Sequence, residues 1–386
     1  MKYMSEQLSY DPGLGNTAMC KSSITYLNGE QGVLLYRGYP IEQVAGGPES
    51  LDFVQTALLV STGEVPSVNE KESFESLMRE SIENANRDRV LKLAELMRDQ
   101  HPMDFLHAAA LTVEGVGSEG TEDQYRSSLA KYVALTPLMH ADFMRTKLNL
   151  EPGEWDTDVN YSERFYKARF GEINQDMADV LDLLLVLHAD HEQNCSATTA
   201  RTVASSKAGV RHVVGAAIGA LSGPLHGGAN EEVVRQLEEM LSSGHGPEVL
   251  MRQVIAGERR LMGFGHRVYK NFDPRAVIIK SAAERVAAHV SGGDALLKLA
   301  MELEKIALEQ DYFISRKLYP NVDFYSGLIY RGIGFDVSEY TSLFAVGRMP
   351  GWISQSAEQA GDKEQRIVRP QQIYTGNDRR ELRRAH

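Results

Sequence analysis

Apolar residues recur at helical spacing through most of this chain. Residues 208–221 are small and apolar, and residues 231–243 begin with two glutamates, which suit a helix N-terminus. Asp294 can cap a further helix, because its carboxylate can accept backbone N–H groups. Within residues 178–188, positions i, i+3, i+4 and i+7 are Val180, Leu183, Leu184 and Leu187. Strands and helices do not alternate as in a doubly wound sheet, so an all-α fold is predicted.

One segment departs from this pattern. In residues 23–36, the stretches SSITYL and GVLLY are rich in apolar and aromatic residues. Asn28 and Gly29 stand between them and form a typical turn signal. We therefore predict a short N-terminal β-hairpin.

Glycine and proline interrupt the helical pattern at four places where unusual polar residues gather. Functional side chains often lie on short irregular segments between rigid elements. Reactive groups are therefore expected in these four segments: HADHEQN (188–194), GPLHGGAN (223–230), GFGHRVYKNFDPRA (263–276) and YPNVDFYSG (319–327).

Length and charge limit the possible functions. A chain of 386 residues suits two unequal domains, or one large helical domain with an insertion. Its 41 basic and 53 acidic residues give a net charge of −12, which argues against nucleic-acid binding. Two cysteines, Cys20 and Cys195, do not make a disulfide framework. The chain has no run of roughly eighteen apolar residues and begins without an apolar signal core, so we expect a cytoplasmic protein without a membrane span.

Two of the four segments carry histidines beside glycines. His226 lies between Pro224 and two glycines, and it is either a reactive group or a carbonyl cap at a helix junction. His266 is followed by Arg267, Lys270 and Arg275, a combination that suits an anionic ligand or a basic surface loop. The dinucleotide pattern GxGxxG is absent here.

The other two segments are equally ambiguous. His188, Asp190 and His191 crowd into HADHE, but their spacing does not match the zinc motif HExxH, so a polar helix end facing a cleft is favoured over a metal site. Asp323 in NVDFYSG is either a turn residue or a partly desolvated base beside two aromatic residues. Arg348 and Arg369, taken singly, would be ordinary surface arginines.

The order of these motifs is more informative than any one of them. Read along the chain as HADHE, PLHGGAN, GFGHRVYKNFDPRA, NVDFYSG, FAVGRMPGW and RPQQIYTG, the sequence resembles the citrate synthase family. The resemblance covers nearly the whole chain and is densest from residue 188 to residue 376. The stretches LMGFGHRVYKN and HADHEQN are most similar to the bacterial type II enzymes.

The resemblance implies a carbon–carbon bond formation between acetyl-CoA and oxaloacetate, followed by hydrolysis of citryl-CoA. His226 would donate a hydrogen bond to the thioester carbonyl and stabilise the enol. Asp323 would remove the methyl proton. His266 would polarise the ketone of oxaloacetate and protonate the new alkoxide. Acetyl-CoA would be a co-substrate, and no cofactor would be bound permanently.

The same resemblance assigns the binding residues. Phe344 would line the acetyl pocket. Oxaloacetate would be bound by His191, Arg275, Arg348 and Arg369, and CoA by Leu261, Met262, Gly263 and Asn321. Arg369 would reach the site from the other subunit, which implies a homodimer.

The implied fold has a large helical domain, residues 1–226 and 331–386, and a small domain, residues 227–330, that closes over the cleft and excludes water. Longer bacterial relatives carry an additional β-rich segment before the SITYLNG hairpin, and many are hexamers inhibited by NADH with a cysteine before HADHE. Residues 170–180 read FGEINQDMADV and contain no cysteine. We therefore expect a dimer without NADH control of that kind.

Three alternatives remain open. A 2-methylcitrate synthase would use propionyl-CoA with the same machinery, but such relatives usually read GFGHPVY where this chain has GFGHRVY. A non-catalytic scaffold would be expected to lack His226, His266 or Asp323, and all three are present. A metal hydrolase would use His188, Asp190 and His191, and would lose its activity in a chelator.

Overall fold

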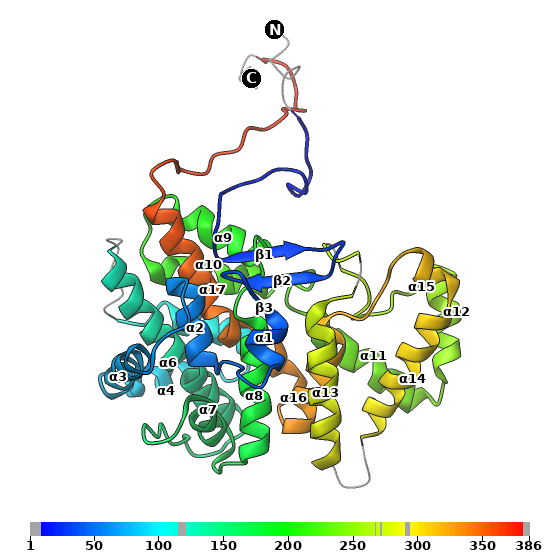
Figure 1. Ribbon diagram of the computed structural model, residues 1–386, viewed down its shortest axis with the longest axis horizontal. Helices are drawn as coiled ribbons and strands as arrows, with labels where there is room; N and C mark the ends of the chain where they lie inside the picture. The colour runs from blue at the N-terminus through cyan, green and yellow to red at the C-terminus, as the bar shows by residue number, and fades with distance from the viewer. Residues whose placement is uncertain (1–8, 115–120, 267, 271, 290–293, 381–386) are drawn as a thin grey trace, which may run out of the picture.

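The computed structural model describes residues 9–114, 121–266, 268–270, 272–289 and 294–380. Its regular structure is almost wholly helical, which confirms the predicted all-α class (Figure 1). The first helices are α1 (Ile41–Gly46), α2 (Phe53–Thr62), α3 (Val68–Glu83), α4 (Arg87–Leu96), α5 (Pro102–Ala110), α6 (Glu122–Lys147), α7 (Tyr161–Phe170), α8 (Gln175–His188), α9 (Cys195–Ala204) and α10 (Val210–Leu221). The others are α11 (Ala229–Ser243), α12 (Pro247–Ile255), α13 (Pro274–His289), α14 (Ala295–Glu309), α15 (Asp311–Ser315), α16 (Val322–Ile333), the 3₁₀ helix η1 (Val337–Glu339) and α17 (Tyr340–Gly361).

The predicted helices are present. Residues 178–188 belong to α8 and residues 231–243 to α11, while the predicted segment 208–221 forms α10 from residue 210 onward. Asp294 caps α14, because its carboxylate accepts the N–H groups of Leu296 and Leu297. Local periodicity and capping were therefore sufficient to locate these elements.

The predicted hairpin is also present, with one strand more than expected. Strands β1 (Thr25–Asn28) and β2 (Val33–Tyr36) pair in antiparallel register, and β3 (Tyr39–Pro40) adds to β2. The turn spans residues 29–32, because Asn28 pairs with Val33. The side-chain oxygen of Asn28 accepts the N–H groups of residues 30 and 31, which shapes this longer turn.

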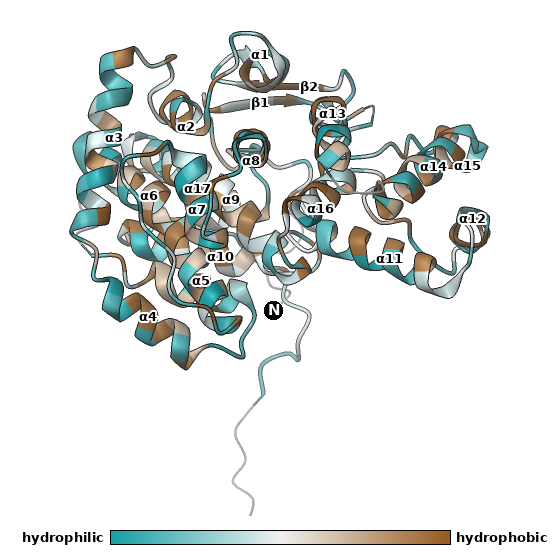
Figure 2. Cartoon of the chain, turned by 90° about the horizontal axis from the view of Figure 1, so that it is seen from below, coloured by the Kyte–Doolittle hydropathy of each residue, from teal (hydrophilic) through white to brown (hydrophobic). Residues whose placement is uncertain are grey.

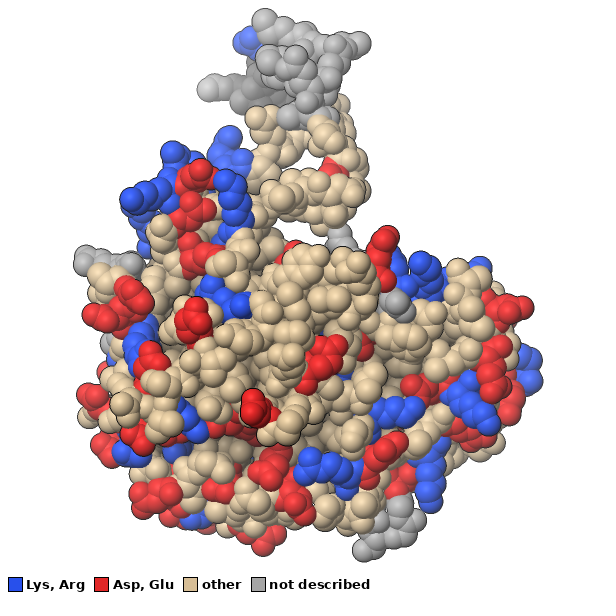
Figure 3. Space-filling view, viewed as in Figure 1, with Lys and Arg blue, Asp and Glu red and all other residues tan. Residues whose placement is uncertain are grey.

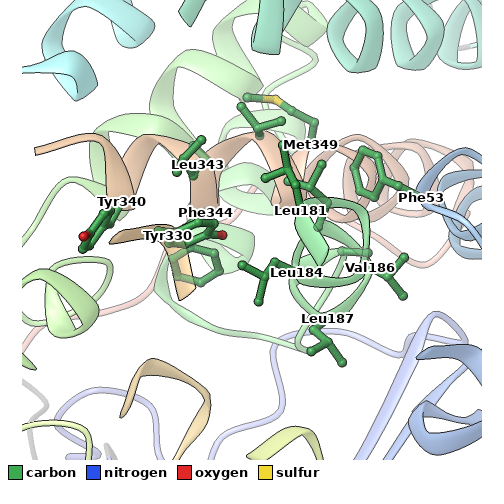
Figure 4. Close-up of a cluster of buried hydrophobic side chains, with 14 of the residues drawn as sticks. Phe53, Leu181, Leu184, Val186, Leu187, Tyr330, Tyr340, Leu343, Phe344 and Met349 are labelled. Atoms are coloured by element: carbon green, nitrogen blue, oxygen red, sulfur yellow. The ribbon is translucent and has the colours of Figure 1, made fainter. Parts of the chain in front are cut away.

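Helix α17 forms the centre of the larger helical mass. It is buried almost continuously from Tyr340 to Ser356 and packs on α2, α6, α8, α9 and α10. Figure 4 shows side chains of α8 and α17, among them Leu184, Leu343 and Phe344, packed in one cluster. A helix that is buried on all sides fixes the positions of its side chains closely, so α17 is a rigid support for any residue it presents.

The helices divide into two groups in space. Helices α2 to α7 lie on one side of the molecule, and α11, α12, α14 and α15 lie on the other (Figure 1). The chain crosses between the two groups twice, and the two crossings meet at Thr341. The hydroxyl of Thr341 lies 3.2 Å from the carbonyl oxygen of Gly227 and 2.6 Å from Glu231 Oε1, and it can donate to either. Helix α11 is amphipathic, with apolar residues facing α14 and α16 (Figure 2).

The surface carries charges of both signs. Acidic and basic side chains are interspersed over the face seen in Figure 3. Among the residues that the structure describes, no helix is both long enough and apolar enough to cross a membrane.

Candidate active site

Three of the four interrupted segments converge on the side of α17 that carries Phe344. The ring of Phe344 lies 4.6 Å from that of His188 and 6.4 Å from that of His226, measured between centroids. The ring of His191 lies 5.4 Å from that of His266. Segments that are far apart in the sequence therefore contribute histidines to one region.

His226 follows α10 and contacts the first turn of α9. Its Nε2 lies 3.2 Å from the backbone nitrogen of Ser196 and 2.9 Å from the Ser196 hydroxyl. Because a backbone N–H can only donate, Nε2 is an acceptor and the ring proton lies on Nδ1. Burial, together with the nearby positive charge of Arg348, lowers the pKa of His226 to about 4. His226 is therefore a neutral donor through Nδ1.

His266 has the opposite tautomer. Its Nδ1 accepts the backbone N–H groups of Val268 at 3.1 Å and Tyr269 at 3.2 Å. The ring proton is therefore on Nε2. Burial lowers the pKa of His266 to about 4, and the positive charge of Arg275 acts in the same direction. The molecule thus holds two neutral imidazole donors whose tautomers are set by backbone contacts.

Asp323 is the second residue of α16. The interruption in the helical pattern therefore ends before this residue, and the interpretation of Asp323 as a turn residue is wrong. Asn321 caps this helix by accepting the N–H of Asp323 at 2.9 Å. Burial raises the pKa of Asp323 to about 6, the direction predicted from its sequence surroundings. A carboxylate with this pKa is a stronger base than an ordinary aspartate and is still mostly ionised at neutral pH.

A short backbone pairing ties the His266 segment to Asp323. Gly265 N donates to Tyr319 O at 2.8 Å, and Asn321 N donates to Gly263 O at 2.9 Å. The backbone of Gly263 has φ +73°, and a Cβ there would lie 2.9 Å from Phe324. Only glycine fits this position, because it tolerates positive φ and leaves room for α16.

The predicted CoA residues surround this pairing. Leu261 is buried, Met262 N donates to Gln236 Oε1, and the amide of Asn321 donates to Gly265 O. The polar groups of this segment therefore maintain its shape. Binding of CoA here stays a prediction from the sequence.

Two of the three predicted arginines are buried close to the histidines. Arg348 donates through Nε to the carbonyl of His188 at 2.5 Å, and its guanidinium lies 4.7 Å from the Phe344 ring centroid. Burial lowers the pKa of Arg348 to about 10. Arg275 forms a two-point ion pair with Asp273, with N–O distances of 3.0 and 2.8 Å. A guanidinium group is a natural partner for a carboxylate, so both side chains could bind an acidic substrate.

Arg369 does not join them in this chain. It is exposed on the extended segment that follows α17 and runs away from the helical body in Figure 1. The segment is anchored next to Arg369 by the hydrogen bond from Val368 N to the Ser205 hydroxyl. Arg267, another cation noted in the sequence, lies outside the described residues.

The HADHE segment holds two buried histidines. His188 Nδ1 lies 2.6 Å from Leu184 O, and burial lowers its pKa to about 3. His191 Nε2 lies 3.3 Å from the hydroxyl of Tyr269. Over the described ranges, no group of three His, Cys, Asp or Glu side chains is arranged to hold a metal ion. Asp190 instead accepts hydrogen bonds from Thr25 and Gln355.

Sequence reasoning missed several residues that set the geometry. Ser196 bridges His226 and the indole of Trp352, whose Nε1 donates to its hydroxyl at 3.0 Å. Asp273 orients Arg275, and Tyr269 links His191 to the His266 segment. Asp273 lies two residues before an arginine, a spacing that suggests an ion pair. Ser196 had no such signal, because its partners are distant in the sequence.

The arrangement suits proton removal from a carbon next to a carbonyl. It combines one carboxylate of raised pKa, two neutral hydrogen-bond donors and two buried cations. The donors can stabilise an oxygen as negative charge develops on it, and the cations can bind an acidic substrate. A separate cavity of about 430 Å³ lies among α3, α4 and α6 and contains none of these residues.

Comparisons with known proteins identify the family. The family model described as "Citrate synthase, C-terminal domain" matches residues 13–371. The chain is 42% identical to the citrate synthase of Corynebacterium glutamicum over 397 residues, covering 99% of this chain and 90% of the relative.

Two solved structures resemble the fold. The citrate synthase of Pyrobaculum aerophilum superposes with a TM-score of 0.87 at 33% identity, covering 96% of this chain and 93% of that chain. A ternary complex of the Thermoplasma acidophilum citrate synthase with carboxymethyl coenzyme A and oxaloacetate superposes with a TM-score of 0.87 at 28% identity, covering 97% and 98%. The family match and these full-length likenesses confirm the resemblance seen in the ordered motifs, and the chain belongs to the citrate synthase family.

Proposed function

We propose that this enzyme forms citrate through His226, His266 and Asp323. Asp323 removes a methyl proton from acetyl-CoA while His226 Nδ1–H passes its proton to the thioester oxygen, which gives an enol. The enol carbon attacks the ketone carbon of oxaloacetate, and the enol proton returns to His226 Nδ1. His266 Nε2–H delivers a proton to the ketone oxygen as it becomes the hydroxyl of citryl-CoA, and the proton held by Asp323 restores His266. Water then cleaves the thioester and releases citrate and CoA.

The opposite tautomers of the two histidines carry this proposal. An aspartate with a pKa near 6 is too weak to form a free enolate, since each unit of pKa mismatch costs about 1.4 kcal/mol. A hydrogen bond that strengthens as the oxygen becomes negative lowers this cost. The site supplies one such donor for the thioester and one for the ketone, and it holds each by contacts to the backbone.

Oxaloacetate binding is assigned to His191, Arg275 and Arg348. All three side chains are buried. The ring of His191 lies 5.4 Å from that of His266, the charge of Arg275 acts on His266, and the charge of Arg348 acts on His226. Arg369 would complete the site from a second copy of the chain, because it is exposed and distant from its own site. Residues 227–330 would close over the bound substrates and exclude water. CoA would lie along Leu261, Met262, Gly263 and Asn321, and the enzyme would act in the cytoplasm without a permanent cofactor.

The direct test is thiol release from acetyl-CoA with and without oxaloacetate. We expect strict dependence on oxaloacetate, and a fall in kcat of about 10³-fold or more in each of His226→Ala, His266→Ala and Asp323→Ala. Retention of activity in any folded variant would remove that residue from the mechanism. Full activity in a chelator is expected, whereas its loss would favour the metal hydrolase alternative.

Subunit complementation tests the role of Arg369. Two inactive chains, Arg369→Ala and Asp323→Ala, are unfolded together, refolded and assayed. In a shared-site dimer one of the two sites of each mixed dimer is intact, so about one quarter of the wild-type activity should return. No recovery, with mixed dimers shown to form, would place Arg369 in its own subunit's site or outside the site.

Acetyl-CoA is preferred over propionyl-CoA in this proposal. The relatives compared above are citrate synthases, which favours citrate over 2-methylcitrate as the product. The ratio of kcat/KM for the two thioesters is the test, and a clear propionyl preference would reverse the assignment.

A further inference from the structure

The turn of the N-terminal hairpin touches the segment that orients His266. Lys270 N donates to Gly29 O at 2.8 Å. A Cβ built on Gly29 would lie 2.0 Å from Val268 O and 2.6 Å from its carbonyl carbon. At the other end of the turn, Gly32 has φ +66°, and a Cβ there would lie 2.8 Å from Phe272 O. The two main chains therefore meet with no room for a side chain.

Three consecutive N–H groups are divided between His266 and the hairpin. The N–H groups of Val268 and Tyr269 point to His266 Nδ1 and fix its tautomer, while that of Lys270 points to Gly29 O. Residues 268–270 are thus bonded on one side to the imidazole and on the other to the hairpin. Tyr269 extends the connection further, since its hydroxyl contacts His191.

We propose that the β1–β2 turn is a positioning element for catalysis, with Gly29 as its contact residue. The absence of a side chain at Gly29 leaves room for the carbonyl of Val268, and the carbonyl of Gly29 accepts the N–H of Lys270. These two contacts hold residues 268–270 in place. The N–H groups of residues 268 and 269 then keep the proton of His266 on Nε2, facing the ketone. The role rests on the proposed function of His266. Although the hairpin lies far from the other site residues in the sequence, it thereby helps His266 to polarise oxaloacetate.

Gly29→Ala tests this directly. The backbone of Gly29 lies outside the positive-φ region, so the added methyl group introduces a clash with Val268 O and no backbone strain of its own. We expect kcat to fall at least tenfold while Tm changes by less than about 3 °C, because a surface turn contributes little to global stability. The KM for acetyl-CoA should stay within about twofold, since the thioester donor His226 is untouched.

A spectroscopic measurement separates positioning from packing. A hydrogen bond from His266 lowers the stretching frequency of the ketone of bound oxaloacetate, which infrared difference spectra detect. In Gly29→Ala this frequency should move toward that of free oxaloacetate. An unchanged frequency and a wild-type kcat in the folded variant would overturn the proposal.

Matched substitutions complete the experiment. Gly46 at the end of α1 faces α13, and the Cβ of Gly46→Ala would lie at an ordinary 3.4 Å from Ile278, so kcat should be unchanged. If Gly29→Ala fails to fold, Asn28→Ala loosens the turn without a clash and should lower kcat about threefold, and a wild-type kcat there would overturn the proposal. The variant His266→Ala separates the positioning role of Gly29 from the catalytic role of His266. If His266→Ala were active, the catalytic role of His266 itself would be wrong.

Discussion

Replacing Asp323 with asparagine should make the enzyme inactive and more stable. The substitution keeps the shape of the side chain and removes its charge. The pKa of Asp323 is raised from 3.8 to about 6 by burial, so the folded state disfavours the ionised form. This rise corresponds to about 3 kcal/mol of unfavourable free energy at neutral pH, at about 1.4 kcal/mol for each pKa unit.

The measurable gain will be smaller than this. Asp323 is partly exposed, and solvent screens its charge. It also lies in the first turn of α16, where a negative charge is stabilised by the helix dipole by about 0.3–1 kcal/mol. We therefore expect Asp323→Asn to raise the free energy of unfolding by about 1.5 kcal/mol, or Tm by about 2 °C. The value of kcat should fall about 10³-fold or more.

The pH dependence gives the sharpest check. Because the folded pKa is raised, the penalty is absent below about pH 4, where the carboxyl is protonated in both states, and is complete above about pH 6. Thermal unfolding of Asp323→Asn and wild type should therefore differ at pH 8 and converge at pH 4. The control Asp123→Asn changes an exposed aspartate in the first turn of α6 and should be neutral or slightly destabilising at both. A less stable Asp323→Asn at pH 8 would refute the reasoning.

Three further outcomes are expected. The kcat of the wild type should fall about tenfold per pH unit below about pH 6, since Asp323 must be ionised, and thiol release measured from pH 5 to 9 would disagree if kcat stayed constant throughout. Ser196→Ala should lower kcat about tenfold, because His226 loses its contact with the Ser196 hydroxyl. It should also destabilise the fold by about 1–2 kcal/mol, because the indole of Trp352 loses its acceptor. Kinetics would measure the first effect and calorimetry the second. Glu339→Gln should cost about 3 kcal/mol of stability at pH 7 through its buried pair with Arg169, with kcat per folded molecule unchanged, and wild-type stability in denaturant would contradict it.

The sequence alone determined the class of fold and indicated the candidate reactive residues. Helical periodicity depends on neighbours three and four residues apart, so α8 and α11 could be located without tertiary information. The ordered motifs indicated His226 and His266 as reactive residues before any geometry was known. The local pattern was less informative at Asp323. Proline and asparagine before it suggested a turn, but the residue lies in the first turn of a helix.

Only the tertiary structure decided how these residues act. A histidine's tautomer depends on which ring nitrogen meets a donor, and for His226 that donor is Ser196, thirty residues away in the chain. The raised pKa of Asp323 depends on the packing around it. The support of His266 by Gly29 arises because the hairpin folds onto a segment more than two hundred residues further along. Such contacts follow from the packing of whole elements, which spacing within a sequence does not encode.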